Sequence, residues 1–213
     1  MTSNTVVERL ANLGVSRESM ARLEILVHVL LAWQERINLI APSTIDDVWM
    51  RHVVDSAQLL PLIHKNTSAI ADLGSGAGFP ALVLAAIQPA QVHMFESNAK
   101  KVAFLHEALR QMKVEAFVHR DRLETNSAPK PLPSVQLVTA RAFAPLPLLL
   151  GYAQPFFESG ATALFHKGQD VDAELAEAAK AWEITAQKHS SITDFQSVIL
   201  EVKELKHVKR DQI

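Results

Sequence analysis

The sequence predicts an α/β domain, with a mainly parallel β-sheet covered by helices on both faces and a helical segment before it. Three observations lead to this prediction. From residue 68 onward, short apolar runs alternate with helical patterns, which is typical of parallel strands joined by crossover helices. A glycine-rich turn follows the first of these runs. The last two apolar runs lie close together and indicate a closing β-hairpin, which would make the sheet mixed.

The first 65 residues contain helical patterns and no strand pattern. A short helix is expected over 5–13, and a third helix over about 45–63. Between them, Ser16 can cap a longer helix. Its broad apolar face would consist of Leu23, Ile25, Leu26, Val29, Leu30 and Trp33. We expect residues 1–65 to form a helical extension packed on a domain of residues 66–213, because this segment has no strands of its own.

The second part of the chain supplies the strands and their crossover helices. The expected strands cover 68–73, 91–96, 114–119, 135–139, 160–166, 183–189 and 197–203. The expected helices between them cover 80–87, 99–112, 147–152 and 171–182. In an open parallel sheet, ligands bind beyond the carboxyl ends of the strands. A binding site is therefore expected in the turn that follows the first strand.

That turn, Gly74-Ser75-Gly76-Ala77-Gly78, has the physical properties of a nucleotide-binding loop. Glycines let the backbone turn tightly and approach a ligand without interference from a Cβ atom. Dinucleotide sites have the spacing G-x-G-x-x-G, but here Phe79 stands where the third glycine of that motif would be. A phenylalanine obstructs the close helix approach that a pyrophosphate site uses. The turn therefore favours a ligand without phosphates.

Two acidic residues flank the turn and narrow the choice of ligand. Asp72 would repel a pyrophosphate but suits the cationic sulfonium and ammonium groups of S-adenosylmethionine. Glu96 ends the next strand, where a carboxylate can accept hydrogen bonds from both ribose hydroxyls. The alternative is an ordinary tight turn with a solvated acid. The turn, the acid and the strand–helix–strand frame together favour S-adenosylmethionine as the cofactor.

Composition excludes several other chemistries. The chain has 213 residues, a net charge of -2 and no cysteine. Without cysteine there is no disulfide, no thiolate metal site and no cysteine nucleophile of the kind used to methylate carbon 5 of pyrimidines. The near-neutral charge argues against a general nucleic-acid binder, although a local basic face remains possible. The nine histidines form no H-x-x-x-H or H-x-H pair, so no metal site is expected.

Neither a signal-peptide pattern nor an apolar run of transmembrane length occurs in the sequence. A cytoplasmic protein without membrane contact, acting as a monomer, is therefore expected.

Several charged residues are candidates for contact with a substrate. Arg51 and Asp55 have the i, i+4 spacing of an ordinary surface ion pair, which is the alternative to a functional role. Arg141 follows the strand 135–139 among small apolar residues, where burying an unpaired arginine is costly, so a functional role is favoured. Lys167 lies at the end of the next strand in the same way, and a functional role for it has weaker support than for Arg141. After the fourth strand the chain lacks the Pro-Pro-aromatic motif of enzymes that methylate exocyclic amines of adenine or cytosine.

An ordered set of segments over residues 28–170 resembles one family, the bacterial small-subunit (16S) ribosomal RNA methyltransferase G family, also called glucose-inhibited division protein B. The matching segments are Leu31-Ala32-Trp33, Asn38-Leu39, Arg51-His52, Asp55-Ser56, Asp72 to Pro80, Glu96-Ser97, Lys101, Phe104-Leu105, Arg122-Leu123-Glu124, Arg141-Ala142-Phe143-Ala144 and Lys167-Gly168. The chain departs from the family pattern at Gln34, Ile40, Ala81 and Ala140.

The resemblance implies a Rossmann-like S-adenosylmethionine-dependent methyltransferase fold, with a mixed seven-stranded sheet and an N-terminal helical cap. It implies methylation of ring nitrogen 7 of one guanine in 16S ribosomal RNA, as part of the small ribosomal subunit or an assembly intermediate. It places donor contacts on Gly74, Phe79, Leu123, Glu124 and Arg141, with Glu96 binding the ribose; the turn itself adds Asp72, Gly76 and Gly78. Substrate positioning is expected from Asn38, Arg51, His52, Asp55 and Arg141.

The chemistry agrees with the residues present. Nitrogen 7 of guanine has a free lone pair and no proton, so the reaction needs positioning and desolvation but no general base. Three alternatives stay open at this point. They are a methyltransferase of a small molecule or protein, a nicotinamide-binding oxidoreductase, and a non-catalytic interaction protein with a relic donor site.

Overall fold

The computed structural model describes residues 3–120 and 132–208. Two helices open the chain, as predicted. They are α1 (Asn4–Asn12) and α2 (Arg17–Gln34). The side chain of Ser16 caps α2 by accepting the Ser19 N–H at 3.1 Å, which satisfies one of the free donors of the first turn.

The prediction of one long third helix over 45–63 is wrong. The segment instead contains a 3₁₀ turn (Pro42–Thr44), a π-helix (Trp49–Val54), one α-helical turn, α3 (Asp55–Ala57), and a second 3₁₀ turn (Leu60–Leu62). Side chains bond to the backbone inside this segment: Ser56 Oγ donates to the His52 carbonyl at 2.6 Å, and the Gln58 amide to the Asp55 carbonyl at 3.0 Å. Such bonds compete with the regular α-helical ladder.

The predicted mixed sheet with a closing hairpin is confirmed. Its strands are β1 (Ala69–Leu73), β2 (Gln91–Phe95), β3 (Phe117–His119), β4 (Leu137–Arg141), β5 (Thr162–Lys167), β6 (Trp182–Ser190) and β7 (Val198–His207). They form one seven-stranded sheet in the order β3-β2-β1-β4-β5-β7-β6. The first five strands are parallel, whereas β7 runs antiparallel to both β5 and β6.

The strand order reverses beside β1, which pairs with β2 on one side and with β4 on the other. Leu73, the last residue of β1, pairs with Phe95 of β2 and Ala140 of β4. The three strands therefore end at the same edge. This reversal is the point at which open α/β sheets bind their ligands.

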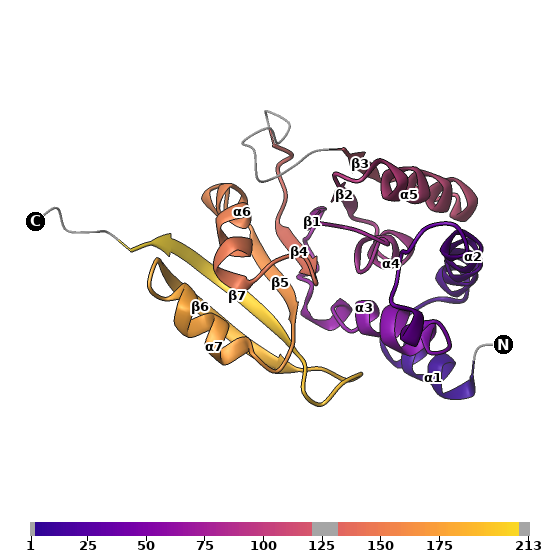
Figure 1. Cartoon of the computed structure of the whole chain (residues 1–213), viewed down its shortest axis with the longest axis horizontal. Helices are drawn as coiled ribbons and strands as arrows, with labels where there is room; N and C mark the ends of the chain where they lie inside the picture. The colour runs from indigo at the N-terminus through magenta and orange to yellow at the C-terminus, as the bar shows by residue number, and fades with distance from the viewer. Residues whose placement is uncertain (1–2, 121–131, 209–213) are drawn as a thin grey trace, which may run out of the picture.

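Helices cover both faces of the sheet, as Figure 1 shows. They are α4 (Ala81–Ile87), α5 (Ala99–Met112), α6 (Leu146–Glu158) and α7 (Val171–Ala178). Alternate residues of β1 point to opposite faces of the sheet. Ile70 belongs to the first core, which is covered by α2, α4 and α5. Ala71 and Leu73 belong to the second core, which is covered by α6 and α7. Helix α6 runs past the predicted end at residue 152 and includes Pro155, because Phe156 is buried in the second core.

The N-terminal helices share a core with the sheet domain. Leu23, Leu26 and Leu30 of α2 lie in the same apolar cluster as Phe104 and Leu105 of α5. This packing supports the proposal that residues 1–65 do not fold alone. Among the described residues, no helix is both long enough and apolar enough to cross a membrane.

Replacing Leu30 tests this shared core. Leu30 is completely buried, so Leu30→Ala should lower the free energy of unfolding of the whole chain by about 2–5 kcal/mol. Denaturant titration followed by circular dichroism should show this loss within one transition. Ile25→Ala on the same helix is the control, because Ile25 is 36% exposed and should change stability by less than ~1 kcal/mol. A separate early transition in Leu30→Ala would show instead that the helices fold independently.

Candidate active site

Three glycines with positive φ build the turn after β1. The φ angles of Gly74, Gly76 and Gly78 are +67°, +57° and +80°. A Cβ on Gly74 would run into the ring of Phe143, and one on Gly78 would run into Leu82. A Cβ on Gly76 would find its nearest atom 3.7 Å away. Packing therefore requires glycine at the two ends of the turn, while at Gly76 only the backbone conformation favours it.

Glu96 holds the middle of this turn from the end of β2. One oxygen of its carboxylate accepts the Gly76 N–H at 2.8 Å and the other accepts the Asn98 N–H at 2.7 Å. Glu96 is nevertheless one of the residues that line the cavity above the turn. A carboxylate has about four lone-pair sites, so two backbone donors leave it able to accept further hydrogen bonds.

Asp72 lies behind the turn and does not line the cavity. It is 1% exposed, and its Oδ1 accepts a hydrogen bond from Thr139 Oγ1 of the neighbouring strand at 2.7 Å. Its Oδ2 has no hydrogen-bond partner among the described residues. Burial raises the pKa of this carboxyl to about 6. The structure thus places a poorly compensated acidic group directly beneath the glycine turn.

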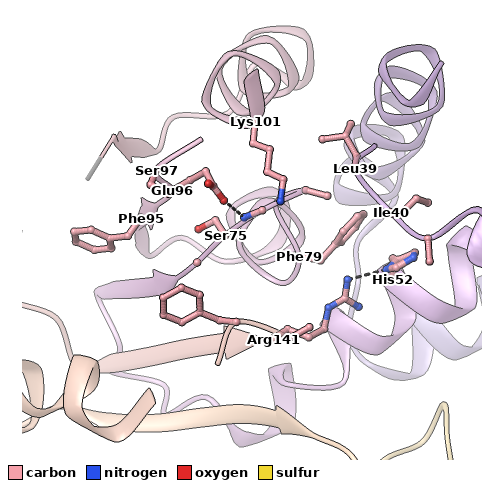
Figure 2. A pocket seen from close by; sticks show the side chains of 16 residues that line it. Leu39, Ile40, His52, Ser75, Phe79, Phe95, Glu96, Ser97, Lys101 and Arg141 are labelled. Atoms are coloured by element: carbon pink, nitrogen blue, oxygen red, sulfur yellow. Dashed lines mark hydrogen bonds between the residues drawn. The ribbon is translucent and has the colours of Figure 1, made fainter. Parts of the chain in front are cut away.

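A cavity of about 430 Å³, here called the first cavity, lies above the glycine turn (Figure 2). Of the predicted cofactor-binding residues, Gly74, Gly76, Phe79, Glu96 and Arg141 line it. Gly78 and Asp72 support it from outside, and Leu123 and Glu124 lie outside the described residues. Its volume is within the range typical of small-molecule sites.

Some residues that line the first cavity were not predicted. Lys101 of α5 reaches toward it, and Leu39 and Ile40 form another part of its wall (Figure 2). The side chain of Gln34 holds this wall, because its Oε1 accepts the N–H groups of Leu39 at 2.9 Å and Ile40 at 3.0 Å. Gln34 was visible in the sequence only as a departure from the family pattern.

A second cavity of about 410 Å³ adjoins the first. His52, Arg141, Ala142 and Phe143 line both, so the two cavities share a wall. Most of the polar residues that line the rest of the second cavity come from the segment 44–55, from the end of β5 and from the turn between β6 and β7. They are Thr44, Arg51, Asp55, His166, Lys167, Ser191, Asp194 and Ser197.

Arg141 is the centre of the shared wall. One terminal nitrogen donates to Asp55 Oδ2 and to the Arg51 carbonyl, both at 3.1 Å, and the other donates to His52 Nδ1 at 2.7 Å. Its guanidinium carbon lies 5.2 Å from the centroid of the Phe79 ring. The side chain is only 17% exposed. Burial lowers the pKa of Arg141, and the Asp55 carboxylate opposes that shift, so the guanidinium stays charged.

His52 is neutral in this wall. Its Nδ1 accepts from Arg141, which assigns the proton to Nε2, and Nε2 then donates to Thr44 Oγ1 at 2.9 Å. The imidazole also stacks on Phe79, with 5.0 Å between ring centroids. Burial, followed by the nearby Arg141 charge, lowers the pKa of His52 to about 4.

Asp55 joins the shared wall to other segments. Its Oδ1 accepts from Thr193 Oγ1 at 2.6 Å and from Gln58 Nε2 at 2.7 Å, while His166 Nε2 lies 2.9 Å from its carbonyl oxygen. The alternative of an Arg51–Asp55 surface ion pair does not occur. The guanidinium of Arg51 lies 3.6 Å from Asp194 instead.

The structure brings four of the predicted substrate residues together, namely Arg51, His52, Asp55 and Arg141. It does not bring Asn38 with them: Asn38 is exposed, accepts a 3.3 Å hydrogen bond from Gln34 and lines neither cavity. Lys167 lines the second cavity but pairs with Glu174 at 2.5 Å. His166, which was not predicted, precedes it at the end of β5.

The fold and the site together define the class: this is the fold of S-adenosylmethionine-dependent methyltransferases. Similar solved structures include a chain of the fibrillarin/Nop5p complex, with a TM-score of 0.52 and 12% identity over 73% of this chain and 82% of that one. Another is ribosomal protein L11 methylase from Lactobacillus delbrueckii subsp. bulgaricus, with a TM-score of 0.52 and 14% identity over 72% of this chain and 78% of that one. At such identities the likeness shows the fold alone.

Sequence comparison identifies the family. The family model described as rRNA small subunit methyltransferase G matches residues 19–203. Proteins named ribosomal RNA small subunit methyltransferase G are similar over nearly the whole chain. The one from Paramagnetospirillum magneticum is 44% identical over 93% of this chain and 95% of its own length. The one from Rhodospirillum rubrum is 46% identical over 92% of this chain and 95% of its own length. The chain therefore belongs to the rRNA small subunit methyltransferase G family.

The crowded glycine of the turn gives a first prediction for the site. Gly74→Ala should weaken the binding of S-adenosylhomocysteine by more than about tenfold, because the new Cβ displaces Phe143 from the wall of the first cavity. Isothermal titration calorimetry measures this. Gly160→Ala is the control: Gly160 has a φ of +91° with open space around it, so this variant carries backbone strain but should bind normally. Equal affinities in both variants would contradict the prediction.

The buried His52 predicts a pH dependence of stability. Its folded pKa of about 4 lies below the unfolded value of 6.5, so the folded state binds fewer protons between these values. As pH falls from 6.5 to 4, the wild type should lose about 3 kcal/mol that His52→Gln does not lose. Denaturant titrations of both proteins at pH 7.5, 6, 5 and 4 measure the difference. A difference that stays constant with pH would show that His52 titrates normally.

Proposed function

We propose that this chain transfers a methyl group from S-adenosylmethionine to nitrogen 7 of a guanine in 16S ribosomal RNA. The observation that carries the proposal is the pair of adjoining cavities that share the Arg141–His52 wall. A methyl transfer needs a donor and an acceptor that meet at one point, and two cavities with a common wall provide such a point. The names of the relatives, which are ribosomal RNA small subunit methyltransferases, support the choice of substrate.

The first cavity fits S-adenosylmethionine. Glu96 can accept hydrogen bonds from the ribose hydroxyls, and the aromatic ring of Phe79 offers an apolar surface. The buried Asp72, with its unpartnered Oδ2, places negative charge beneath the turn, which suits a ligand with sulfonium and ammonium groups. The bound donor supplies an electrophilic methyl group on its sulfonium. Leu123 and Glu124 remain predicted donor contacts.

The second cavity would hold the guanine. The hydrogen bonds of Arg141 to Asp55, Arg51 and His52 use three of its five N–H groups, which leaves two for a substrate. Arginine commonly donates to the oxygen at position 6 of guanine. His52 is neutral, so it adds no charge opposite the ring, and the Asp55 carboxylate offsets the positive charge that the guanine acquires on methylation.

The residues of the second cavity need not remove a proton, because nitrogen 7 of guanine carries none. Their contribution is to orient the base and to exclude water, and neither task needs a cysteine, which this chain lacks. The net charge of -2 supplies little general affinity for RNA. We therefore expect specificity to come from the shape of the assembled small subunit or of an assembly intermediate, with a local contribution from Arg51.

Two other functions remain testable. A nicotinamide-binding oxidoreductase would bind NADH, so calorimetry with NADH and with S-adenosylhomocysteine separates the two classes; only the second ligand should bind. A methyltransferase of a small molecule or protein would act without RNA. Methyl transfer to a metabolite pool or to ribosomal proteins, with none to ribosomal RNA, would replace the proposed substrate.

The direct test measures 7-methylguanosine by mass spectrometry in digests of 16S ribosomal RNA, after incubating purified protein with S-adenosylmethionine and small subunits that lack the modification. The wild type should produce it. Asp55→Asn should lower kcat/KM about 100-fold, because Arg141 loses its charged partner and no longer positions the base. Arg110→Ala is the control, since Arg110 pairs with Glu107 and neither residue lines a cavity. Full activity in Asp55→Asn would rule out the positioning role.

A further inference from the structure

The turn between β6 and β7, residues 191–197, borders the second cavity and extends beyond the sheet at the bottom of Figure 1. Ser191, Asp194 and Ser197 of this turn line the cavity. Phe195 lies between two of these residues and is 94% exposed, more than any other large apolar residue in the described part of the chain. An aromatic side chain in this position contributes nothing to the core, and residues on both sides of it in the sequence line the second cavity.

Hydrogen bonds within the turn fix its conformation. The carboxylate of Asp194 accepts the Gln196 N–H and the Ser197 hydroxyl, each at 3.0 Å, and faces Arg51 at 3.6 Å. The N–H of Ser191 donates to the Ser197 carbonyl at 3.0 Å, which closes the base of the turn. The residues on either side of Phe195 in the sequence, Asp194 and Gln196, both take part in these hydrogen bonds, which hold the backbone of Phe195 in place.

The N-terminal helical segment holds the other half of the turn. Thr193 Oγ1 donates to Asp55, Gln58 Oε1 accepts the Ile192 N–H at 2.9 Å, and Arg9 donates to the Ile192 carbonyl at 2.8 Å. The turn is therefore attached to the same Asp55 that holds Arg141. A side chain presented by such a rigid support loses little conformational entropy when it binds a partner.

We propose that Phe195 stacks on a nucleobase of the ribosomal RNA beside the target guanine when that guanine enters the second cavity. This inference rests on the function proposed above. A guanine that leaves its stack exposes the faces of its neighbours, and aromatic side chains provide a surface for such unstacked bases. Phe195 would replace part of the stacking that the RNA loses.

The surroundings of Phe195 favour a base over a protein partner. A protein interface of useful affinity buries a contiguous apolar patch, whereas this turn exposes only Phe195 and, to 45%, Ile192. The other residues around Phe195 are Thr193, Asp194, Gln196 and Ser197, which are all polar. So small an apolar surface, with one aromatic ring, matches one face of a nucleobase. Arg51, half-exposed at the rim of the same cavity, provides positive charge near the path of the RNA backbone.

Steady-state methylation of small subunits tests the proposal. Phe195→Ala should raise KM for the subunit about tenfold, as expected for the loss of one stacked base, and should leave S-adenosylhomocysteine affinity and thermal stability unchanged. Phe195→Trp keeps an aromatic face and should retain the wild-type KM. Phe117→Ala is the matched control, because Phe117 is a half-exposed phenylalanine on β3, at the opposite edge of the sheet.

An unchanged KM in Phe195→Ala, with an active wild type, would overturn this inference alone. If the wild type methylates no guanine at all, the proposed function fails first. Photocrosslinking with p-benzoylphenylalanine in place of Phe195 identifies the partner directly. Adducts on 16S ribosomal RNA would support the proposal, whereas adducts only on a ribosomal protein would overturn it and assign a protein partner to the turn.

Discussion

The architecture of the site depends on the partly buried ion pair between Arg141 and Asp55. Arg141 ends the central strand β4, whereas Asp55 begins α3 in the N-terminal segment, so the pair connects the sheet to its helical extension. Removing water from two charges is costly, and further hydrogen bonds to both groups offset this cost. Here Thr193 and Gln58 donate to Asp55, while Arg141 also donates to His52 and to the Arg51 carbonyl.

The hydrogen bonds of this pair depend on the irregular backbone around it. A regular α-helix over 45–63 would place Arg51 and Asp55 on one face, where they would neutralise each other. The π-helix over Trp49–Val54 instead lets Asp55 face Arg141 and the Arg51 carbonyl accept from the same guanidinium. π-turns are frequent at functional sites for this kind of reason.

Most of the fold was predictable from local patterns. The strands, the glycine turn and the order of elements follow from apolar periodicity and from turn residues, both of which act over short distances. The break in the third helix was not predictable, because it depends on contacts with Arg141 and with the turn at 191–197, which are distant in the sequence. The i, i+4 spacing of Arg51 and Asp55 therefore suggested an ion pair that does not form.

The candidate site was predicted only in part, because some of its residues follow from local patterns and others from contacts that are distant in the sequence. Residues at strand ends, such as Glu96 and Arg141, were found because topology alone brings strand ends together. His166 was missed although it lies beside Lys167, since a single histidine at the end of a strand forms no motif that would indicate a site. Asn38 was included on resemblance, yet it lies outside both cavities, and it is Gln34 that holds the adjoining wall.

The wall shared by the two cavities also has a thermodynamic consequence. Arg141 and His52 line both cavities, so a ligand that shifts these side chains in one cavity changes the free energy of binding in the other. Linkage makes such coupling reciprocal: the factor by which the donor alters affinity for the RNA equals the factor by which the RNA alters affinity for the donor. In the proposed reaction the donor loses its methyl group and the guanine gains charge at this wall, so the coupling between the two sites differs between substrates and products.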